Sequence, residues 1–205
     1  ELNRLAISPD RLISLQNTSV NVDCNQVIYL HQPLPFVDYR FSPLKRAEFK
    51  AYLYSKFYLI FVKLFLNDNS IFVVQTNWMQ EALVLKNFVN RVYVIKPDIN
   101  LPSSVKSYSA YPLVFLYPAT PLFYKNHLFL VKVISALADD IAFNSVVLQV
   151  TFSLGDYPEF DILVRRLSIE KNICYLGYLD QTDLYNKYQE CSAVLFPSFI
   201  ETFGL

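Results

Sequence analysis

Hydrophobic and polar residues divide the chain into two kinds of segment. Short apolar runs, rich in β-branched and aromatic residues, are typical of buried parallel strands. Longer segments with helical spacing separate these runs, which predicts an α/β fold of βαβ units with parallel sheets and right-handed crossovers. The expected strands cover residues 12–15, 26–30, 71–75, 92–95, 113–117, 146–151, 173–176 and 193–196. The expected helices cover residues 43–66, 78–88, 125–142, 157–171 and 181–191.

One stretch between the strands has no hydrophobic periodicity. Residues 96–111 contain Pro97, Pro102 and several serines, which is the composition of a loop rather than of a helix or strand. Such a stretch is typical of a connection between domains. We therefore expect a first domain over residues 1–100, a linker over residues 101–111 and a second domain over residues 112–205.

Composition excludes several function classes. Only 3 of the 205 residues are glycine, and neither G-x-G-x-x-G nor G-x-x-x-x-G-K-S/T occurs, so dinucleotide-binding and P-loop folds are not expected. The net charge is zero, which gives no general attraction to nucleic acid. Residues 1–106 carry 12 basic and 8 acidic residues (+4), and the rest carries 6 and 10 (−4). The first half is therefore the one suited to an anionic partner or surface.

The cysteines do not form a metal-binding pattern. Cys24, Cys174 and Cys191 are far apart in sequence, no C-x-x-C pair is present, and the chain has 2 histidines. This pattern does not predict a zinc site. An odd number of isolated thiols fits a reducing compartment, so we expect a cytoplasmic location.

The segment 44–66 is the most basic part of the first half. Its charged side chains are Lys45, Arg46, Lys50, Lys56 and Lys63, with Glu48 as the single acid. Lysines interrupt its apolar stretch, which is shorter than the roughly 20 residues that span a bilayer. It can be a core helix with basic residues on its wet edge. The alternative is an interfacial helix that contacts anionic headgroups at the inner face of a membrane.

Lys125 is a candidate ligand-binding residue. It follows strand 113–117 and a proline-containing turn, and it is expected to open the next helix. Free backbone N–H groups at a helix start can bind an anion together with a lysine, although an ordinary surface lysine is the alternative. His127, farther inside this helix, is expected on its surface.

The last residues of the chain also follow a predicted strand. After strand 193–196 come Pro197, Ser198 and Glu201, and then the glycine of the segment 202–205. A carboxylate and accessible backbone amides beyond a parallel strand are typical of polar-ligand sites in α/β sheets. Glycine would allow close approach of a ligand to the backbone. A glutamate after a strand can otherwise be an ordinary helix cap or loop residue.

These motifs together resemble a known family. Pro-Ser-x-x-Glu-x-Phe-Gly-Leu at residues 197–205 resembles the signature of the retaining GT-B glycosyltransferases of family four (glycosyl transferases group 1). Lys125-Asn126 stands where that family has Lys-Gly or Lys-Asn. Residues 172–179 are similar to the family strand that ends in Gly and Tyr, here Gly177 and Tyr178. The three elements occur in the family order.

The resemblance implies a GT-B fold, with two Rossmann-like domains whose parallel sheets face a cleft. It implies transfer of a sugar from a nucleotide diphosphate sugar to an acceptor hydroxyl with retention, in glycan or cell-envelope polysaccharide synthesis. No metal and no cofactor other than the donor substrate is expected. The amino-terminal strand with its glycine-rich loop and the second glutamate of the signature are not found. We therefore expect both domains to be incomplete, and this fragment alone to be inactive and poorly soluble.

The resemblance also assigns site residues. Glu201 and His31 take the catalytic positions, and Lys125 binds the donor diphosphate. The remaining donor-binding residues are Tyr178, Thr202, Phe203, Gly204 and Leu205. Thr120 stands where the family has an arginine, so the usual second cation for the diphosphate is absent. Other residues after strands that can line the same cleft are Asn17, Thr76 and Asn77, and either of the last two can instead cap the next helix.

The expected partners are a nucleotide-sugar donor and a glycan or lipid-linked acceptor, without nucleic acid. Peripheral membrane contact through residues 44–66 is the open alternative described above. Two other functions also stay open: a nucleotide-sugar epimerase of GT-B fold, and a non-catalytic sugar-binding relative.

Overall fold

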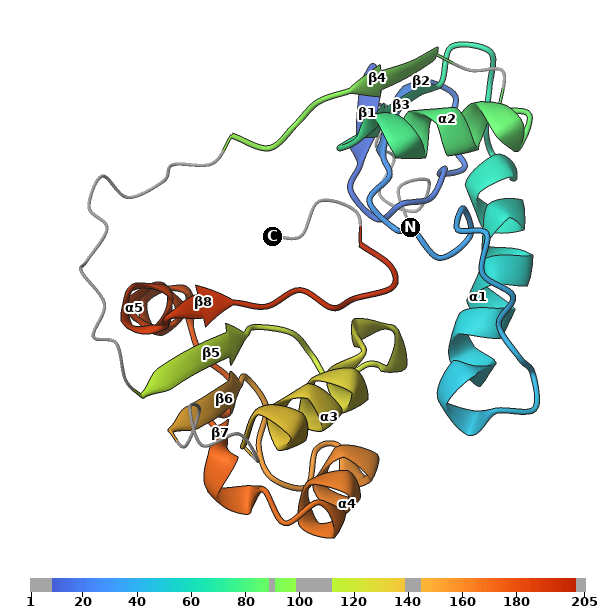
Figure 1. The fold of residues 1–205 in the computed structure, drawn as a ribbon. Coiled ribbons are helices and arrows are strands. Elements are labelled where there is room, and N and C mark those ends of the chain that lie inside the picture. The colour runs from blue at the N-terminus through green and yellow to red at the C-terminus, as the bar shows by residue number, and fades with distance from the viewer. Residues whose placement is uncertain (1–8, 89–90, 99–111, 139–144, 202–205) are drawn as a thin grey trace. The chain divides into compact units, whose positions relative to one another are not determined.

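A computed structural model of the chain shows an α/β fold with two separate parallel sheets (Figure 1). The structure describes residues 9–88, 91–98, 112–138 and 145–201. The chain divides into two compact units, residues 1–99 with 200–205 and residues 100–199. The linker expected at residues 101–111 lies outside the described residues.

The first unit has a sheet whose strands follow one another in sequence order. They are β1 (Arg11–Ser14), β2 (Asn25–Tyr29), β3 (Ile71–Val74) and β4 (Arg91–Val94). All neighbours in the order β1-β2-β3-β4 are parallel. The connecting helices are α1 (Arg46–Lys63) and α2 (Asn77–Leu85). Each strand–helix–strand step therefore moves the chain one position in the same direction across the sheet.

The core of the first unit joins both helices to the sheet. Phe72 and Val74 of β3 pack with Tyr58 and Val62 of α1 and with Leu83 of α2, and all five are buried. Full burial stabilises each such side chain by roughly 1.5–3 kcal/mol. Only one side of α1 contributes to this core.

The second unit has a sheet in which the strand order reverses. Its strands are β5 (Leu113–Tyr117), β6 (Val146–Val150), β7 (Ile173–Tyr175) and β8 (Ala193–Val194). Its helices are α3 (His127–Ala138), α4 (Pro158–Arg166) and α5 (Gln181–Glu190), with short 3-10 turns η2 (Phe123–Lys125) and η4 (Glu170–Asn172). The parallel order is β7-β6-β5-β8, so β8 returns to the opposite side of β5.

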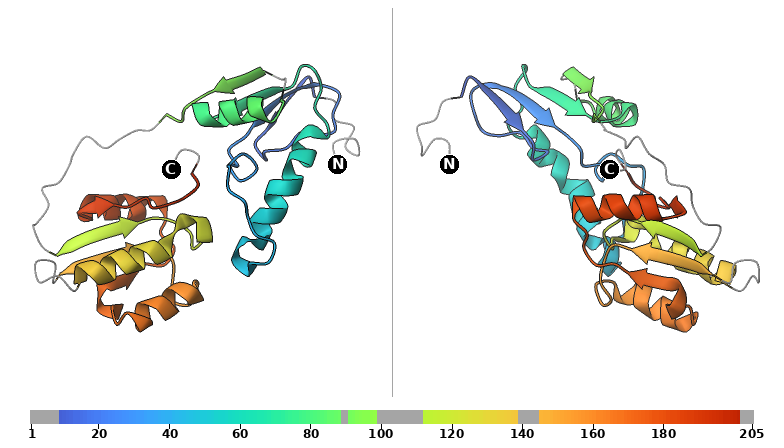
Figure 2. Two further views of the ribbon diagram at one scale, coloured as in Figure 1. Left: turned by 45° about the vertical axis from the view of Figure 1, so that its right-hand side comes forward. Right: turned by 90° about the vertical axis from the view of Figure 1, so that its left-hand side faces the viewer.

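This reversal separates the helices of the second unit. Figures 1 and 2 show α3 and α4 on one face of its sheet and α5 on the other. Right-handed crossovers produce this arrangement when the chain changes direction across a sheet. Ligands of open α/β sheets bind beyond the carboxyl ends of the strands at such a switch point. In this unit the switch point lies between β5 and β8.

Two helix predictions are wrong at their boundaries because of left-handed backbone. Asn126 has φ 60°, so α3 begins at His127 and Lys125 lies in the preceding 3-10 turn. Ser168 has φ 54°, which ends α4 before the expected residue 171. A residue at positive φ cannot continue a right-handed helix.

The prediction that His127 lies on the helix surface is also wrong. Its side chain is completely buried in the second unit, with its ring 4.5 Å from that of Tyr117 and 5.2 Å from that of Phe152. Helix α3 is apolar on most of its circumference, so its sequence does not indicate which side faces the sheet.

Candidate functional site

Two loops of the second unit meet at the carboxyl ends of β5 and β8. The first follows β5 and contains the 3-10 turn Phe123–Lys125, and the second follows β8 and contains Pro197, Ser198 and Phe199. They are far apart in sequence, but β5 and β8 are paired neighbours in the sheet. The meeting point is the switch point of the strand order, where ligand binding is expected.

Hydrogen bonds join the two loops directly. The backbone N–H of Phe199 donates to the carbonyl of Tyr124 at 2.8 Å. The side-chain amide of Asn126 donates to the carbonyl of Pro197 at 3.1 Å. The left-handed conformation of Asn126 thus ends the turn, while its side chain contacts the second loop. These contacts hold the segment leading to Glu201 beside the turn that carries Lys125.

Tyr117, at the end of β5, adds a buried link between the same loops. Its hydroxyl donates to the carbonyl of Lys125 at 2.6 Å and forms a hydrogen bond of 2.7 Å with Ser198 Oγ. Tyr117 is completely buried, so a hydroxyl left without these bonds would cost about 1–3 kcal/mol. Tyr117 therefore positions both loops from below. Its place as the last residue of a strand ahead of a lysine-containing turn is the one sequence signal that could have identified it.

His127 underlies this arrangement. It packs among four aromatic rings, those of Tyr117, Phe152, Tyr157 and Phe160. Neither ring nitrogen has a hydrogen-bond partner. Burial lowers the pKa of His127 to about 4. The backbone of Ala119 raises this pKa by a smaller amount, and the positive charge of Lys125 lowers it further. His127 is therefore neutral at pH 7 and acts as a packing residue.

Lys125 lies at the exit of this turn, half-buried, with its Nζ 5.7 Å from the ring centre of Tyr124. Helix α3 starts two residues later. Its first backbone N–H groups point toward the amino-terminal end, where a positive partial charge favours an anion. The lysine and the helix start are thus close together along the chain, but the lysine does not open the helix as expected. Thr120, earlier in the loop, is exposed.

Tyr178 lies beyond β7 at the same edge of the sheet. Gly177 before it has φ 70°, and its N–H donates to the carbonyl of Phe152 at 3.3 Å. The tight turn leaves Tyr178 93% exposed. An exposed ring of this kind can stack on a planar ligand group.

In the first unit, His31 and Asn17 lie together beyond neighbouring strands β2 and β1. The amide oxygen of Asn17 accepts from the backbone N–H groups of His31 (2.6 Å) and Gln32 (3.1 Å). This fixes the amide so that its Nδ2 faces His31 Nε2 at 3.3 Å. If Nδ2 donates, His31 Nε2 is the acceptor and Nδ1 carries the proton.

The turn that carries Asn17 is itself held by the core of the first unit. Asn17 has φ 60°, a conformation that asparagine tolerates better than most residues. The buried hydroxyl of Tyr58 in α1 donates to the carbonyl of Asn17 at 2.6 Å. Asn17 and His31 are thus in direct contact, and the prediction that they line a ligand cleft stays a prediction. Thr76 has a buried hydroxyl without a hydrogen-bond partner and makes no side-chain cap.

The remaining predicted site residues are described only in part. Glu201 is half-buried and follows Phe199 by two residues. Thr202, Phe203, Gly204 and Leu205 lie outside the described residues. In the part of the chain that the structure describes, no group of three or more His, Cys, Asp or Glu side chains could hold a metal ion.

Solved structures of glycosyltransferases share this fold. TarM of S. aureus, in complex with fondaparinux, α-GlcNAc-glycerol and UDP, matches with a TM-score of 0.64 at 14% identity, over 87% of this chain and 33% of its own. The pneumococcal O-GlcNAc transferase GtfA, in complex with UDP and GlcNAc, matches with a TM-score of 0.64 at 15% identity, over 99% and 40%. WaaG, a glycosyltransferase involved in lipopolysaccharide biosynthesis, matches with a TM-score of 0.64 at 12% identity, over 98% and 56%.

The chain has the GT-B glycosyltransferase fold. It spans between one third and just over half of the length of these GT-B structures. No family model and no curated protein matches the sequence. The expectation of a GT-B fold in the α/β class is thus confirmed, at sequence identities that carry the fold alone.

Proposed function

We propose that the full-length protein is a retaining glycosyltransferase that moves a sugar from a nucleotide diphosphate sugar to an acceptor hydroxyl. The observation that carries this proposal is the hydrogen-bonded pair of loops at the β5/β8 switch point. One loop provides Lys125 and the start of α3, and the other leads to Glu201. The UDP bound to TarM and GtfA supports a nucleotide diphosphate donor for this fold.

In this proposal the loops at the β5/β8 switch point, together with Glu201 after them, hold the donor. Lys125 and the first N–H groups of α3 neutralise the diphosphate, so that no metal is needed to stabilise the leaving group. Tyr178 stacks on the base. Glu201 accepts hydrogen bonds from hydroxyls of the donor sugar.

His31 is proposed to act from the first unit as a neutral donor. With Nε2 occupied by Asn17, the Nδ1 proton can be donated to an oxygen of the donor sugar. During transfer, the bond from the anomeric carbon to the diphosphate oxygen breaks and its electron pair stays on the diphosphate. The acceptor oxygen forms the new bond on the same face of the sugar, and its proton leaves with the diphosphate. This geometry retains the anomeric configuration.

The test is incubation of the full-length protein with labelled nucleotide sugars. Transfer to an acceptor, or hydrolysis with retained configuration, supports the proposal. An epimerised nucleotide sugar, or binding without turnover, contradicts it. The variants Lys125→Ala and Glu201→Gln should each lose transfer by a factor of about 100 or more, the cost of one electrostatic contact to the transition state. Lys132→Ala is the matched control, because Lys132 is exposed on α3 beyond its first turn.

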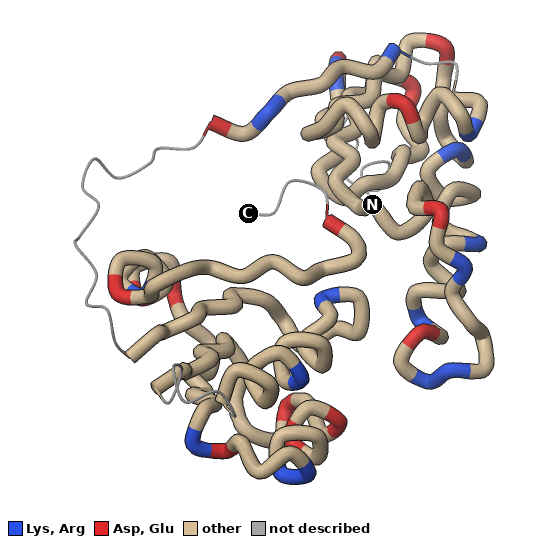
Figure 3. Tube along the Cα trace, in the orientation of Figure 1, with Lys and Arg blue, Asp and Glu red and all other residues tan. Residues whose placement is uncertain are grey.

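We further propose that α1 lies on a membrane surface when the enzyme works. Six large apolar side chains of α1 and of the residue that follows it are between 39% and 57% exposed, namely Phe49, Leu53, Phe57, Ile60, Phe61 and Leu64. Their spacing places them on one side of the helix. Several basic residues lie along the same helix (Figure 3). Apolar side chains combined with lysines suit the interface of an anionic bilayer.

The exposed side of α1 fits neither a core helix whose wet edge is only basic nor a helix that lies on a membrane without packing on the sheet. Ala51, Tyr58 and Val62 are buried in the core, so the helix is packed, yet its wet side is apolar as well as basic. Among the described residues no helix is long and apolar enough to cross a membrane.

Vesicle sedimentation tests this contact. Phe57→Gln/Ile60→Gln should reduce binding to anionic vesicles, whereas Phe129→Gln/Ile162→Gln should not. The two pairs are matched, with exposures of 52% and 57% in α1 against 52% and 58% in α3 and α4. Equal binding by both double variants would contradict the proposal.

A further inference from the structure

A cavity of about 590 Å³ lies within the first unit. Its volume falls in the range of roughly 300–1,000 Å³ that is usual for small-molecule sites. The loop after β2 and the helix α1 form most of its wall. The side chains that matter for recognition are Asp38, Tyr39, Arg40, Tyr52, Lys56 and Lys86.

The charge of this cavity is positive. Arg40, Lys56 and Lys86 line it together, against the single carboxylate of Asp38. All three cations are exposed, and within the described residues no ion pair joins any of them to a carboxylate. They come from three different segments, so the fold gathers them around one space. An anion entering it would meet three positive groups without displacing an existing partner.

Aromatic rings accompany the cations. Tyr39 and Tyr52 both line the cavity, and the ring of Tyr39 lies 4.9 Å from that of Phe41. Tyrosine offers an apolar ring face together with a polar hydroxyl. This combination suits a sugar ring, whose C–H face is apolar and whose edge carries hydroxyls. Cations and tyrosines side by side therefore fit a molecule that carries both an anionic group and a sugar ring.

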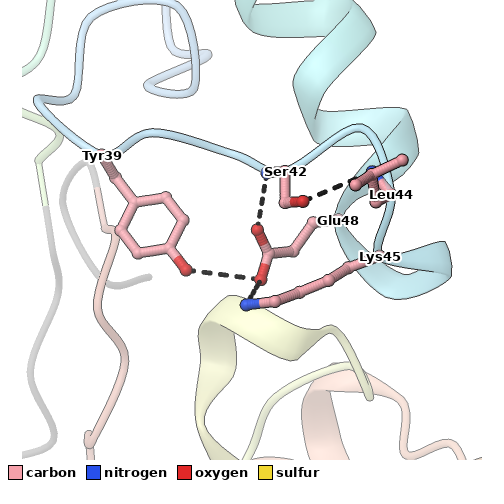
Figure 4. A network of polar contacts seen from close by, with 5 residues as sticks. All are labelled: Tyr39, Ser42, Leu44, Lys45 and Glu48. Atoms are coloured by element: carbon pink, nitrogen blue, oxygen red, sulfur yellow. Dashed lines mark hydrogen bonds and ion pairs between the residues drawn. The ribbon is translucent and has the colours of Figure 1, made fainter.

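The loop that forms the rim is fixed in place by Glu48 (Figure 4). This buried carboxylate accepts from the backbone N–H of Ser42 at 2.8 Å, from Lys45 Nζ at 2.9 Å and from the Tyr39 hydroxyl at 3.4 Å. The hydrogen bond from Ser42, followed by that from Lys45, lowers the pKa of Glu48. The anchor ties the loop to α1 and orients Tyr39. A pre-organised rim reduces the entropy lost when a ligand binds.

We propose that this cavity binds a sugar phosphate, with the phosphate on Arg40, Lys56 and Lys86 and the sugar ring against Tyr39 and Tyr52. The inference deepens the proposed function and rests on it, because it assigns the acceptor to an anionic class. The sugar phosphate has two sources with the same chemistry, a soluble sugar phosphate and the headgroup of a lipid. Lys56 borders both the cavity and the exposed apolar face of α1.

The first experiment measures binding of glucose 1-phosphate to the full-length protein by calorimetry, without any donor. The triple variant Arg40→Gln/Lys56→Gln/Lys86→Gln should weaken binding by about tenfold or more, because the phosphate loses its charge-assisted hydrogen bonds. The control Lys132→Gln/Arg166→Gln/Lys171→Gln removes the same charge from exposed positions of the second unit. Equal affinity of wild type and the cavity variant would overturn the proposal.

The second experiment separates the ring from the charge. Tyr52→Leu should weaken glucose 1-phosphate several-fold and leave inorganic phosphate unchanged, because inorganic phosphate has no ring to stack. Ser55→Cys places a thiol in the cavity wall, where alkylation should slow when glucose 1-phosphate is present. Unaltered alkylation, or equal loss of both ligands in Tyr52→Leu, would contradict the assigned pose.

The third experiment identifies the source. Vesicles with phosphatidylinositol present a phosphate that is esterified to an inositol ring. Vesicles with the same fraction of phosphatidylserine carry the same charge without the ring. Preference for phosphatidylinositol that the cavity variant abolishes indicates a lipid-borne group, and binding of glucose 1-phosphate alone indicates a soluble one. Binding of neither probe overturns the proposal. Lys125→Ala should leave both affinities unchanged, so failure of the cavity and failure of the donor site are distinguishable.

Discussion

In the described residues, each of the two sheets has four parallel strands, but the order of the strands differs between them. In the first unit the order β1-β2-β3-β4 follows the sequence, and in the second the order β7-β6-β5-β8 reverses around β5. Only the reversal places two loops from opposite crossovers next to each other. The comparison explains why the loops that carry Lys125 and Ser198 meet in the second unit, whereas in the first unit no such pair of loops follows from the strand order.

A pair of buried tyrosines makes the same comparison at the level of single residues. Tyr117 connects β5 to the carbonyl of Lys125 and to Ser198, which lie on two loops. Tyr58 connects α1 to the carbonyl of Asn17, which lies on one. Tyr117 thus joins two loops of the second unit, whereas Tyr58 supports a single turn of the first.

The largest expected effect tests which unit holds the donor. Lys125→Ala should reduce sugar transfer by about 100-fold or more, as expected for a group that stabilises developing negative charge. His31→Ala should reduce it by about tenfold, the worth of one hydrogen bond to an uncharged sugar oxygen. Steady-state transfer rates with a labelled nucleotide sugar give both numbers. A greater loss in His31→Ala than in Lys125→Ala would reverse the assignment of the two units.

The next effect is an acid sensitivity confined to the second unit. The pKa of His127 is lowered by burial to about 4, so between pH 6.5 and 4 the unfolded chain binds a proton that the folded chain does not. The stability contributed by neutral His127 is therefore present at pH 7 and falls as the pH drops through this window, by roughly 3 kcal/mol in total.

Two spectroscopic signals can separate the units. The only tryptophan, Trp78, lies in the first unit. Far-UV circular dichroism, which reports both units, should show weaker resistance to urea at pH 5 than at pH 7, while Trp78 fluorescence changes less. His127→Phe should remove this difference. An unchanged pH dependence in His127→Phe would show that another group is responsible.

The tyrosine pair gives a smaller effect. Tyr117→Phe keeps the ring contact with His127 and removes the hydroxyl, which should destabilise the second unit by about 1–2 kcal/mol. It should also raise the KM for the donor several-fold, because the loops of Lys125 and Ser198 lose their common link. Tyr58→Phe should cost similar stability in the first unit with little change in this KM. An equal rise in KM for both variants would remove the distinction between them.

The smallest effect concerns the rim of the cavity. Glu48→Gln should destabilise the first unit by about 1 kcal/mol near pH 7, since the amide replaces a carboxylate that accepts three hydrogen bonds. Because the pKa of Glu48 is lowered on folding, its contribution is present above the ordinary glutamate pKa and is lost as the pH falls through the lowered value. Urea unfolding followed by Trp78 fluorescence should therefore distinguish variant from wild type at pH 7 and converge at low pH. A constant difference at all pH values would exclude the charge as its cause.

Local pattern was sufficient for the secondary structure wherever residues act on their neighbours in sequence. Strand β5 spans Leu113–Tyr117 as expected, because its apolar, aromatic run is bounded by turn residues. The helix around residues 44–66 is observed as α1 (Arg46–Lys63). The errors at Asn126 and Ser168 come from single residues at positive φ, which composition permits but does not require.

Side-chain environments were less predictable. The sequence of α3 begins His-Leu-Phe-Leu-Val-Lys and has no polar stripe to show which side is buried. The prediction that His127 lies on the helix surface is wrong for this reason. The cavity of the first unit also has no local signal. Arg40, Lys56 and Lys86 belong to the loop after β2, to α1 and to the end of α2, and they share one space only in the folded unit.

By itself, the sequence of this chain determined the α/β class, the positions of strands and helices, and the motif positions of Lys125, Tyr178 and Glu201. Each of these depends on residues a few positions apart, through periodicity, turn chemistry or a contiguous motif. The tertiary structure decided that β8 pairs with β5, so that Tyr117 and Ser198, 81 residues apart, share a hydrogen bond. The side of a parallel sheet to which a chain returns depends on the packing of whole helices against its faces, and that packing is a property of the assembled core.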